Sequence, residues 1–206
     1  MAATFLNKLI SGDIYEVPLL KSYGFCYVKL IKYELIFNDV HIIKVLVNPL
    51  NRFDKTRLKN IKELEKISEY AFSPILLLGS PKLRGENSWR FITNVALTNS
   101  ELLIPDFKIT YEINDLFNST KSFSDLQWYK VAQLNASNST KSKYNEVREL
   151  GFFSEMNCLL IIYKLTILWI LQNGRNVEDY FSEDERNQIL GFTVAYQLAS
   201  LEFHNR

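Results

Sequence analysis

Residues 155–172 constrain the fold most, because they are apolar on nearly every side. Their longest apolar part, residues 158–171, is 14 residues long and contains a single charged side chain, Lys164. A membrane span needs about 20 such residues, so the sequence predicts a buried central helix and no membrane insertion. Asn173 and Gly174 follow at the place where a glycine commonly ends a helix.

Such a helix needs many other apolar residues around it, and the composition provides them. The chain has 206 residues, of which 47% are hydrophobic and 23% are charged. This balance predicts one folded domain over residues 1–206 and excludes a disordered or coiled-coil chain. The net charge of +1 gives no general attraction to nucleic acid or to an anionic membrane.

The first part of the chain, residues 1–115, is rich in short runs of β-branched and aromatic residues. Asn48 and Pro49 are expected to end the third of these runs. Leu58, Ile61, Leu64 and Ile67 recur at helical spacing instead, which predicts an amphipathic helix over residues 54–68. The predicted strands cover residues 14–20, 25–33, 40–47, 74–79, 89–95 and 107–113.

The last part, residues 143–206, is expected to be helical, and it follows an irregular stretch at 118–142 that residues 126–129 anchor on the core. Ser182 and Glu185 form a capping box, which predicts the start of a final helix. We therefore predict an α+β fold, with a curved antiparallel sheet in the N-terminal half packed against C-terminal helices. The residues of the final helix that should face inward are Leu190, Val194, Leu198 and Leu201.

Residues that commonly carry catalysis or bind cofactors are few. The two histidines are His41, expected to be half-buried in a strand, and His204 near the C-terminus. No Cys/His spacing predicts a metal site, and no glycine-rich loop predicts a phosphate or nucleotide cofactor. Cys26 and Cys158 are interpreted as free thiols, as in a reducing cytoplasm. The sequence predicts no catalytic residue and thus a protein that is not an enzyme.

Charge is distributed unevenly along the chain. Residues 1–100 carry 14 basic and 9 acidic side chains (net +5), and residues 101–206 carry 10 and 14 (net −4). Residues 44–66 include seven basic and three acidic side chains, and residues 178–185 include five acids. The simplest interpretations are a solvated helix face and a helix N-terminus that favours carboxylates. The alternative is that one of these segments meets a partner of opposite charge.

Three segments resemble a known family. Residues 11–19 (SGDIYEVPL) and 23–28 (YGFCYV) resemble the opening strands of the bacterial immunity protein 26 family. Residues 78–92 (LGSPKLRGENSWRFI) resemble a later segment of that family. Within it, Gly85 predicts a turn of unusual backbone conformation, in which Arg84 reaches a carboxylate or a carbonyl before Trp89 enters the sheet.

The resemblance implies a cytoplasmic antitoxin of a polymorphic toxin system, which neutralises a cognate secreted toxin by binding it. It implies no catalytic residues and no cofactor. An alternative remains open, namely a non-catalytic interaction module or a regulator associated with nucleic acid. The sequence carries no RNP motif that would favour nucleic-acid binding, and it does not predict an oligomeric state.

The acidic segment is the predicted surface for the toxin. Glu183 and Glu185 are expected to be used in helix capping, which leaves Glu178, Asp179 and Asp184 as partner contacts, with Tyr180 or Phe181 as an aromatic anchor. A toxin that acts on nucleic acid needs a basic cleft, and carboxylates can occupy that cleft in place of phosphates. The basic segment, residues 55–66, is the next candidate.

Overall fold

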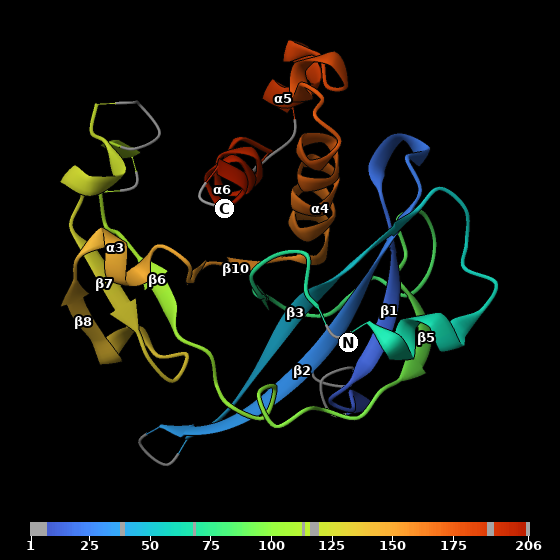
Figure 1. Cartoon of the computed structure of the whole chain (residues 1–206), viewed down its shortest axis with the longest axis horizontal. Coiled ribbons are helices and arrows are strands. Elements are labelled where there is room, and N and C mark those ends of the chain that lie inside the picture. Colours follow the sequence, from blue (N-terminus) through green and yellow to red (C-terminus); the bar gives the residue numbers. More distant parts are fainter. Residues whose placement is uncertain are drawn as a thin grey trace.

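Two long antiparallel strands, β2 (Phe25–Phe37) and β3 (Val40–Asp54), run through the N-terminal half of the molecule (Figure 1). They are the central pair of a six-stranded sheet with the order β10-β4-β3-β2-β1-β5. All neighbours in it are antiparallel except β10 and β4. The computed structural model describes residues 8–37, 40–67, 69–112, 114–115, 120–188 and 192–204. The outer strands are β1 (Asp13–Pro18), β4 (Ile75–Leu77), β5 (Arg90–Asn94) and β10 (Glu155–Met156).

A second sheet of four short strands has the order β8-β7-β6-β9, with β6 and β9 parallel. Its strands are β6 (Phe107–Ile109), β7 (Trp128–Val131), β8 (Ser139–Ser142) and β9 (Gly151–Phe152). The α+β class is therefore confirmed, but the sheet is not one antiparallel sheet. The two parallel strands, β9 and β10, are two residues long each, which is too short to produce a recognisable sequence pattern.

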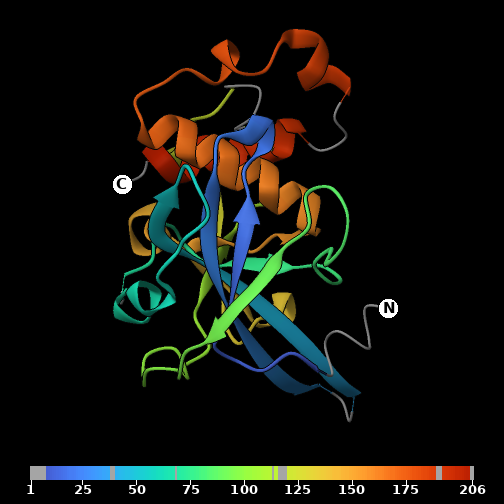
Figure 2. The same cartoon turned by 90° about the vertical axis from the view of Figure 1, so that its right-hand side faces the viewer.

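The predicted central helix is α4 (Cys158–Gln172), which lies across one face of the six-stranded sheet (Figure 2). Its residues Ile161 and Leu165 pack in the main core with Val28, Leu30 and Val45 of the sheet. The helix begins later than predicted, because residues 155–156 pair with β4 as β10. The side chain of Asn157 caps it by accepting the amides of residues 159 and 160.

The last helix, α6 (Phe192–His204), packs beside α4. Leu198 is buried as predicted and Leu201 is partly buried, whereas Val194 is exposed and Leu190 lies outside the described residues. Phe192, Ala195 and Ala199 form the buried face instead, and the small alanine side chains let the two helices approach closely.

The predicted amphipathic helix over residues 54–68 is wrong, because only a short 3-10 helix forms, η2 (Ile61–Lys66). A longer helix would place Lys55, Lys59, Lys62 and Lys66 on one face at spacings of three or four residues, where like charges repel. The upstream chain is instead held to the sheet, since the Leu58 amide donates a hydrogen bond to the Tyr27 hydroxyl at 3.2 Å.

Strand β3 also continues beyond the point where Asn48 and Pro49 were expected to end it. Pro49 lies opposite Val28, where the register of β2 and β3 shifts, so its missing N–H interrupts no ladder bond there. The Pro49 carbonyl accepts the amide of Ala71 at 2.8 Å. Residues 69–71 thus pair with β3 beside this bulge, and β2 pairs with β3 again at residues 53–54.

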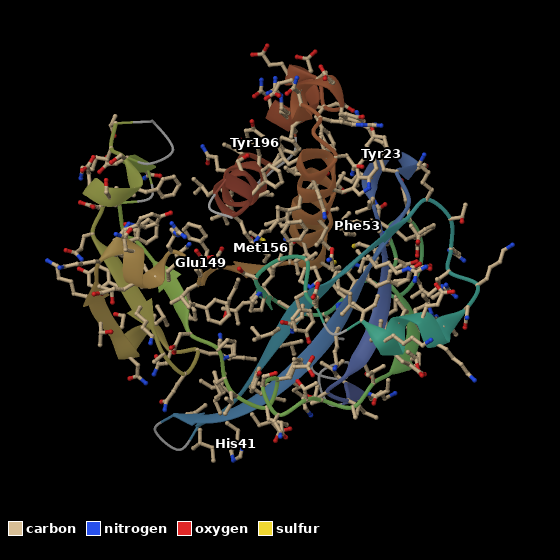
Figure 3. All side chains as sticks on the ribbon, viewed as in Figure 1. Tyr23, His41, Phe53, Glu149, Met156 and Tyr196 are labelled. Atoms are coloured by element: carbon tan, nitrogen blue, oxygen red, sulfur yellow. The ribbon has the colours of Figure 1, made fainter. Side chains whose placement is uncertain are left out.

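Two other strand predictions need correction. His41 is exposed (Figure 3), because the ends of β2 and β3 extend beyond their neighbours in the sheet. Strand β6 is short, and Phe107 and Lys108 are both buried because side chains cover both of its faces. The alternation of residues 107–113 predicts that Phe107, Ile109, Tyr111 and Ile113 share one face. Tyr111, however, is exposed, and Ile113 lies outside the described residues.

The stretch at 118–142, expected to be irregular, contains β7 and β8. The anchor within it is confirmed, since Trp128 is fully buried and its indole N–H donates to the Phe123 carbonyl at 2.7 Å. Short helical turns connect these strands, namely η3 (Phe123–Asp125), η4 (Ala136–Asn138) and α3 (Tyr144–Val147). Both cysteines are free, as predicted.

The turn before β5 has the predicted backbone but not the predicted side-chain contact. Gly85 has a positive φ of 81°, and Trp89 is buried with its amide bonded to the Lys82 carbonyl at 2.7 Å. Arg84, however, is exposed and makes no ion pair or hydrogen bond with any described residue. Arg90, six residues later, makes the contact with a carboxylate instead, that of Glu16.

Two glycines with positive φ should respond differently to substitution by alanine. A Cβ at Gly24 would lie 2.2 Å from the Asp54 carbonyl oxygen, whereas a Cβ at Gly85 would meet only the flexible end of Lys82. Gly85→Ala should cost about 1 kcal/mol of unfolding free energy from backbone strain alone. Gly24→Ala should cost about 2–3 kcal/mol because it adds a steric clash with the backbone. Equal midpoints in urea denaturation would contradict this difference.

Candidate partner-binding surface

The acidic segment follows α4 and crosses the end of that helix, at the top of the molecule in Figure 1. It contains η5 (Val177–Asp179) and the start of α5 (Glu183–Gln188). Val177 and Phe181 are buried in a cluster with Ile170 of α4. These two apolar side chains fix the backbone of the segment, so the acidic residues between and after them project from a held scaffold.

Glu185 is used within the fold, as the sequence predicts. Its carboxylate accepts the amide of Ser182 at 2.9 Å, and the Ser182 hydroxyl accepts the amide of Glu185 at 3.2 Å, which completes the capping box. The same carboxylate lies 2.8 Å from Lys21 Nζ. The Lys21 ammonium and then the Ser182 amide lower the pKa of the Glu185 carboxyl.

The other acids of the segment differ in how far their charge is compensated. Glu178 accepts from the Tyr196 hydroxyl at 3.3 Å and lies 3.5 Å from Arg186 Nη1. The exposed carboxylates of Asp179, Glu183 and Asp184 form no ion pair or hydrogen bond with any residue that the structure describes. Of the predicted contacts, Asp179 and Asp184 are therefore the two whose charge remains open to solvent. Glu183, expected to be used in capping, is open as well.

Tyr180 and Phe181 occupy different positions relative to solvent. Phe181 is 2% exposed, because it packs in the core below Lys21 and against Phe192 of α6. It supports the surface and cannot serve as a contact for a partner, which corrects the expectation for this residue. Tyr180 is half-buried, and its backbone carbonyl accepts a hydrogen bond from Lys21.

Beside Tyr180 lies an aromatic cluster, formed with Tyr23 and Trp169, that the sequence does not predict. Tyr23, labelled in Figure 3, follows η1 in the connection between β1 and β2. Its ring stacks on that of Trp169 of α4, with ring centres 5.1 Å apart, and meets the ring of Tyr180 edge-on at 4.9 Å. The Arg175 guanidinium lies 5.8 Å from the Trp169 ring and 5.7 Å from the Tyr180 ring. These residues are far apart in sequence, so no local pattern could have brought them together.

The turn that carries Tyr23 is itself unusual. Lys21 and Ser22 have φ values of 53° and 58°, a left-handed conformation that non-glycine residues adopt infrequently. Its short 3-10 helix, η1 (Leu20–Ser22), is held by a hydrogen bond from the Leu20 amide to the Thr166 hydroxyl of α4 at 3.1 Å. The turn therefore presents Lys21 and Tyr23 to the acidic segment in one fixed arrangement.

The basic segment forms a separate surface. The side chains of Lys55, Lys59 and Lys62 are exposed along η2 and the chain before it. Nearby, the buried carboxylate of Glu16 accepts two hydrogen bonds from Arg90, at 3.0 and 2.8 Å, and lies 3.4 Å from Arg57. Both arginines therefore have a structural partner, whereas the lysines extend into solvent.

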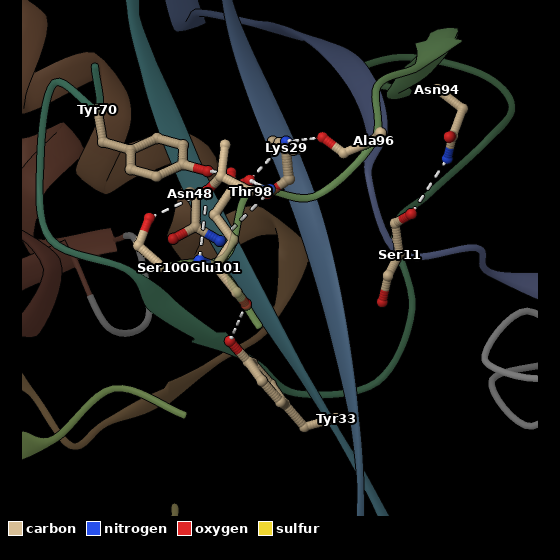
Figure 4. A network of polar contacts seen from close by, with 10 residues as sticks. All are labelled: Ser11, Lys29, Tyr33, Asn48, Tyr70, Asn94, Ala96, Thr98, Ser100 and Glu101. Atoms are coloured by element: carbon tan, nitrogen blue, oxygen red, sulfur yellow. Dashed lines mark hydrogen bonds and ion pairs between the residues drawn. The ribbon is translucent and has the colours of Figure 1, made fainter. Parts of the chain in front are cut away.

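A buried polar network fastens the chain between β5 and β6 to the sheet (Figure 4). Lys29 Nζ lies 2.9 Å from Glu101, and both side chains are buried. The Glu101 carboxylate also accepts the Thr98 amide at 2.7 Å and the Tyr70 hydroxyl. The Tyr33 hydroxyl donates to the carbonyls of residues 101 and 103. The polar groups of this network thus meet one another's hydrogen-bonding and charge requirements, which indicates a structural role.

The described residues give no sign of a metal centre or a membrane span. They hold no group of three or more His, Cys, Asp or Glu side chains that could bind a metal ion. No helix among them is both long and apolar enough to cross a membrane.

The molecule is thus an α+β protein with a rigid surface of carboxylates and aromatic rings. In a comparison with known families, the model of immunity protein 26 matches residues 10–119. The match covers more than half of the chain, which therefore belongs to the immunity protein 26 family. No curated protein and no solved structure matches the chain. The matched residues include Lys21 and Tyr23, whereas the acidic segment lies outside them.

Proposed function

We propose that this protein neutralises a cognate bacterial toxin by binding it, without catalysis, in the cytoplasm of the cell that makes both. Membership of the immunity protein 26 family is the observation that carries the proposal. Co-expression with a candidate toxin from the same genome, if one is encoded in the neighbouring genes, tests it directly. The chain should restore growth, and purified toxin and chain should form a stable complex. Growth arrest in the presence of well-expressed, folded chain would argue against this function.

The proposed toxin contact is the surface formed by Glu178, Asp179, Tyr180 and Asp184. Asp179 and Asp184 support it, because carboxylates without partners keep their full attraction for a basic cleft. The buried side chain of Phe181 supports it in a second way by holding the backbone in place. Little conformational entropy would then be lost on binding. The proposed partner is a toxin with a basic cleft, such as one that acts on nucleic acid.

Reversing two of the open charges should slow association with the toxin. The double variant Asp179→Lys, Asp184→Lys reverses two of the three open charges and leaves Glu183 in place. It is expected to lower the association rate ~10-fold or more at low salt, since steering depends on long-range charge. It should also flatten the dependence of that rate on salt concentration. Stopped-flow or surface-plasmon measurements at low and high salt give both quantities.

A matched control is the double variant Glu65→Lys, Glu86→Lys. The change in net charge is the same, and both residues are exposed and form no ion pair with a described residue. Both lie outside the acidic segment, Glu65 on the basic segment and Glu86 in the turn before β5. The control should retain most of the association rate. If both double variants behave like the unmodified chain, the interface lies elsewhere. Lys59→Glu with Lys62→Glu then tests the basic segment.

A further inference from the structure

A cavity of about 300 Å³ lies where the second sheet meets the C-terminal helix α6. Residues from four separate parts of the chain line it, and half of them are charged. The cavity is thus polar, and its wall combines the family-matched residues with the C-terminal part. The lining residues are Ser73, Lys108, Arg148, Glu149, Leu150, Gly151, Phe152 and Glu202.

Lys108 is the group in this wall that the fold leaves incompletely paired. It is 3% exposed, and its ammonium lies 5.0 Å from the Phe152 ring centre and within about 6 Å of the rings of Trp128 and Tyr144. Its hydrogen-bond acceptor among the described residues is the Arg148 carbonyl. No carboxylate of the described chain lies within ion-pair distance of it.

The other charges around the cavity balance one another. Lys164 Nζ lies 2.6 Å from Glu202, which is 8% exposed and also accepts the Ser73 amide at 2.6 Å. Arg148 Nε lies 2.9 Å from Glu149, which Figure 3 places between α3 and α6. Because each of these two ion pairs has no net charge, the ammonium group of Lys108 is the one uncompensated positive charge in the cavity wall that the described residues form.

We propose that this cavity binds a small oxyanion, a carboxylate or a phosphate, through the ammonium group of Lys108. A buried cation is stable when a charge-assisted hydrogen bond replaces its lost hydration. The volume equals that of about ten water molecules, which fits a small metabolite and not a polymer. The proposal is independent of toxin binding and adds a ligand site to the protein.

The protonation of Lys108 makes the site dependent on pH. Burial lowers the pKa of Lys108 to about 8, against the opposing effect of Glu202 and Glu149. The fraction of Lys108 in the ammonium form therefore falls as the pH rises through this value. Oxyanion binding should be present at pH 7 and decline above pH 8, until the amine is neutral.

The test is an NMR titration of the uniformly ¹⁵N-labelled chain with sodium acetate and, separately, with sodium phosphate. Sodium chloride keeps the ionic strength constant. Saturable shifts are expected in the amides that line the cavity, those of residues 148–152 and Ser73. A response to acetate alone assigns a carboxylate ligand, and a response to phosphate alone assigns a phosphate ligand. No saturable shift with either anion would overturn the proposal.

Variants separate a built site from general surface attraction. Lys108→Met should weaken binding ~10-fold or more, because it removes the charge and keeps the apolar stem. Lys82→Met removes an exposed lysine and should leave binding unchanged. Equal affinity of the unmodified chain and Lys108→Met would refute the assignment to Lys108. Should Lys108→Met not fold, the pH series on the unmodified chain decides, since affinity that does not decline between pH 7 and 9 also refutes it.

Discussion

Replacing Lys29 with methionine should lower the free energy of unfolding by about 3–5 kcal/mol, the cost of leaving one partner of a buried ion pair without the other. The variant keeps Glu101 buried with the Thr98 amide and the Tyr70 hydroxyl, but without a cation. Lys29 also donates to the Ala96 carbonyl at 3.1 Å, so the chain between β5 and β6 would lose two contacts with the sheet. Urea denaturation followed by circular dichroism measures the change.

Lys32→Met is the matched control for this experiment. Lys32 lies on the same strand and forms an ion pair with Glu34 at the same distance, 2.9 Å, but Glu34 is largely exposed. An exposed pair contributes about 0–1 kcal/mol, so the control should change stability little. A similar loss in both variants would show that the burial of the Lys29 pair has no special effect.

Ile167→Ala in α4 should cost about 2–5 kcal/mol of unfolding free energy, because it removes three methyl or methylene groups from a packed core. Ile167 is fully buried in the cluster of side chains where α4 packs against α6 and Phe181. Leu159→Ala on the same helix is the control, since Leu159 is 43% exposed and should cost less than about 1 kcal/mol. If Ile167→Ala lowered the free energy of unfolding by less than about 1 kcal/mol, α4 would not be the centre of the core.

The sequence predicted the elements whose signals are local. The apolar character of α4, the Asn173-Gly174 end and the Ser182–Glu185 capping box all depend on residues within a few positions of one another. The structure confirms each of them. Residues 54–68 show the limit of this reasoning, because the helical spacing of their leucines and isoleucines was outweighed by repulsion among the lysines and by attachment to β2.

The remaining features depend on contacts between distant residues. Nothing local indicates that Tyr23 stacks on Trp169, or that Lys21 neutralises Glu185. The alternation of residues 107–113 predicts Lys108 on the polar face of a strand. Lys108 is buried instead because Trp128 and Phe152, which belong to other strands, cover it. The acidic segment is recognisable from its own residues, and its role as a partner surface stays a prediction; which of its carboxylates stay open could be learned only from the fold.

The family match ends at residue 119, but the hydrophobic core includes residues on both sides of this position. Val28, Leu30 and Val45 lie within the matched residues, yet the cluster that buries them includes Ile161 and Leu165 of α4, beyond residue 119. The turn between β1 and β2 is likewise fastened to α4 and to the acidic segment. The shared part of this family is therefore half of a structural unit here, and a version with a different C-terminal part must supply its own cover for the same sheet. Divergence in that cover would alter the adjoining surface while the strands beneath it stay the same.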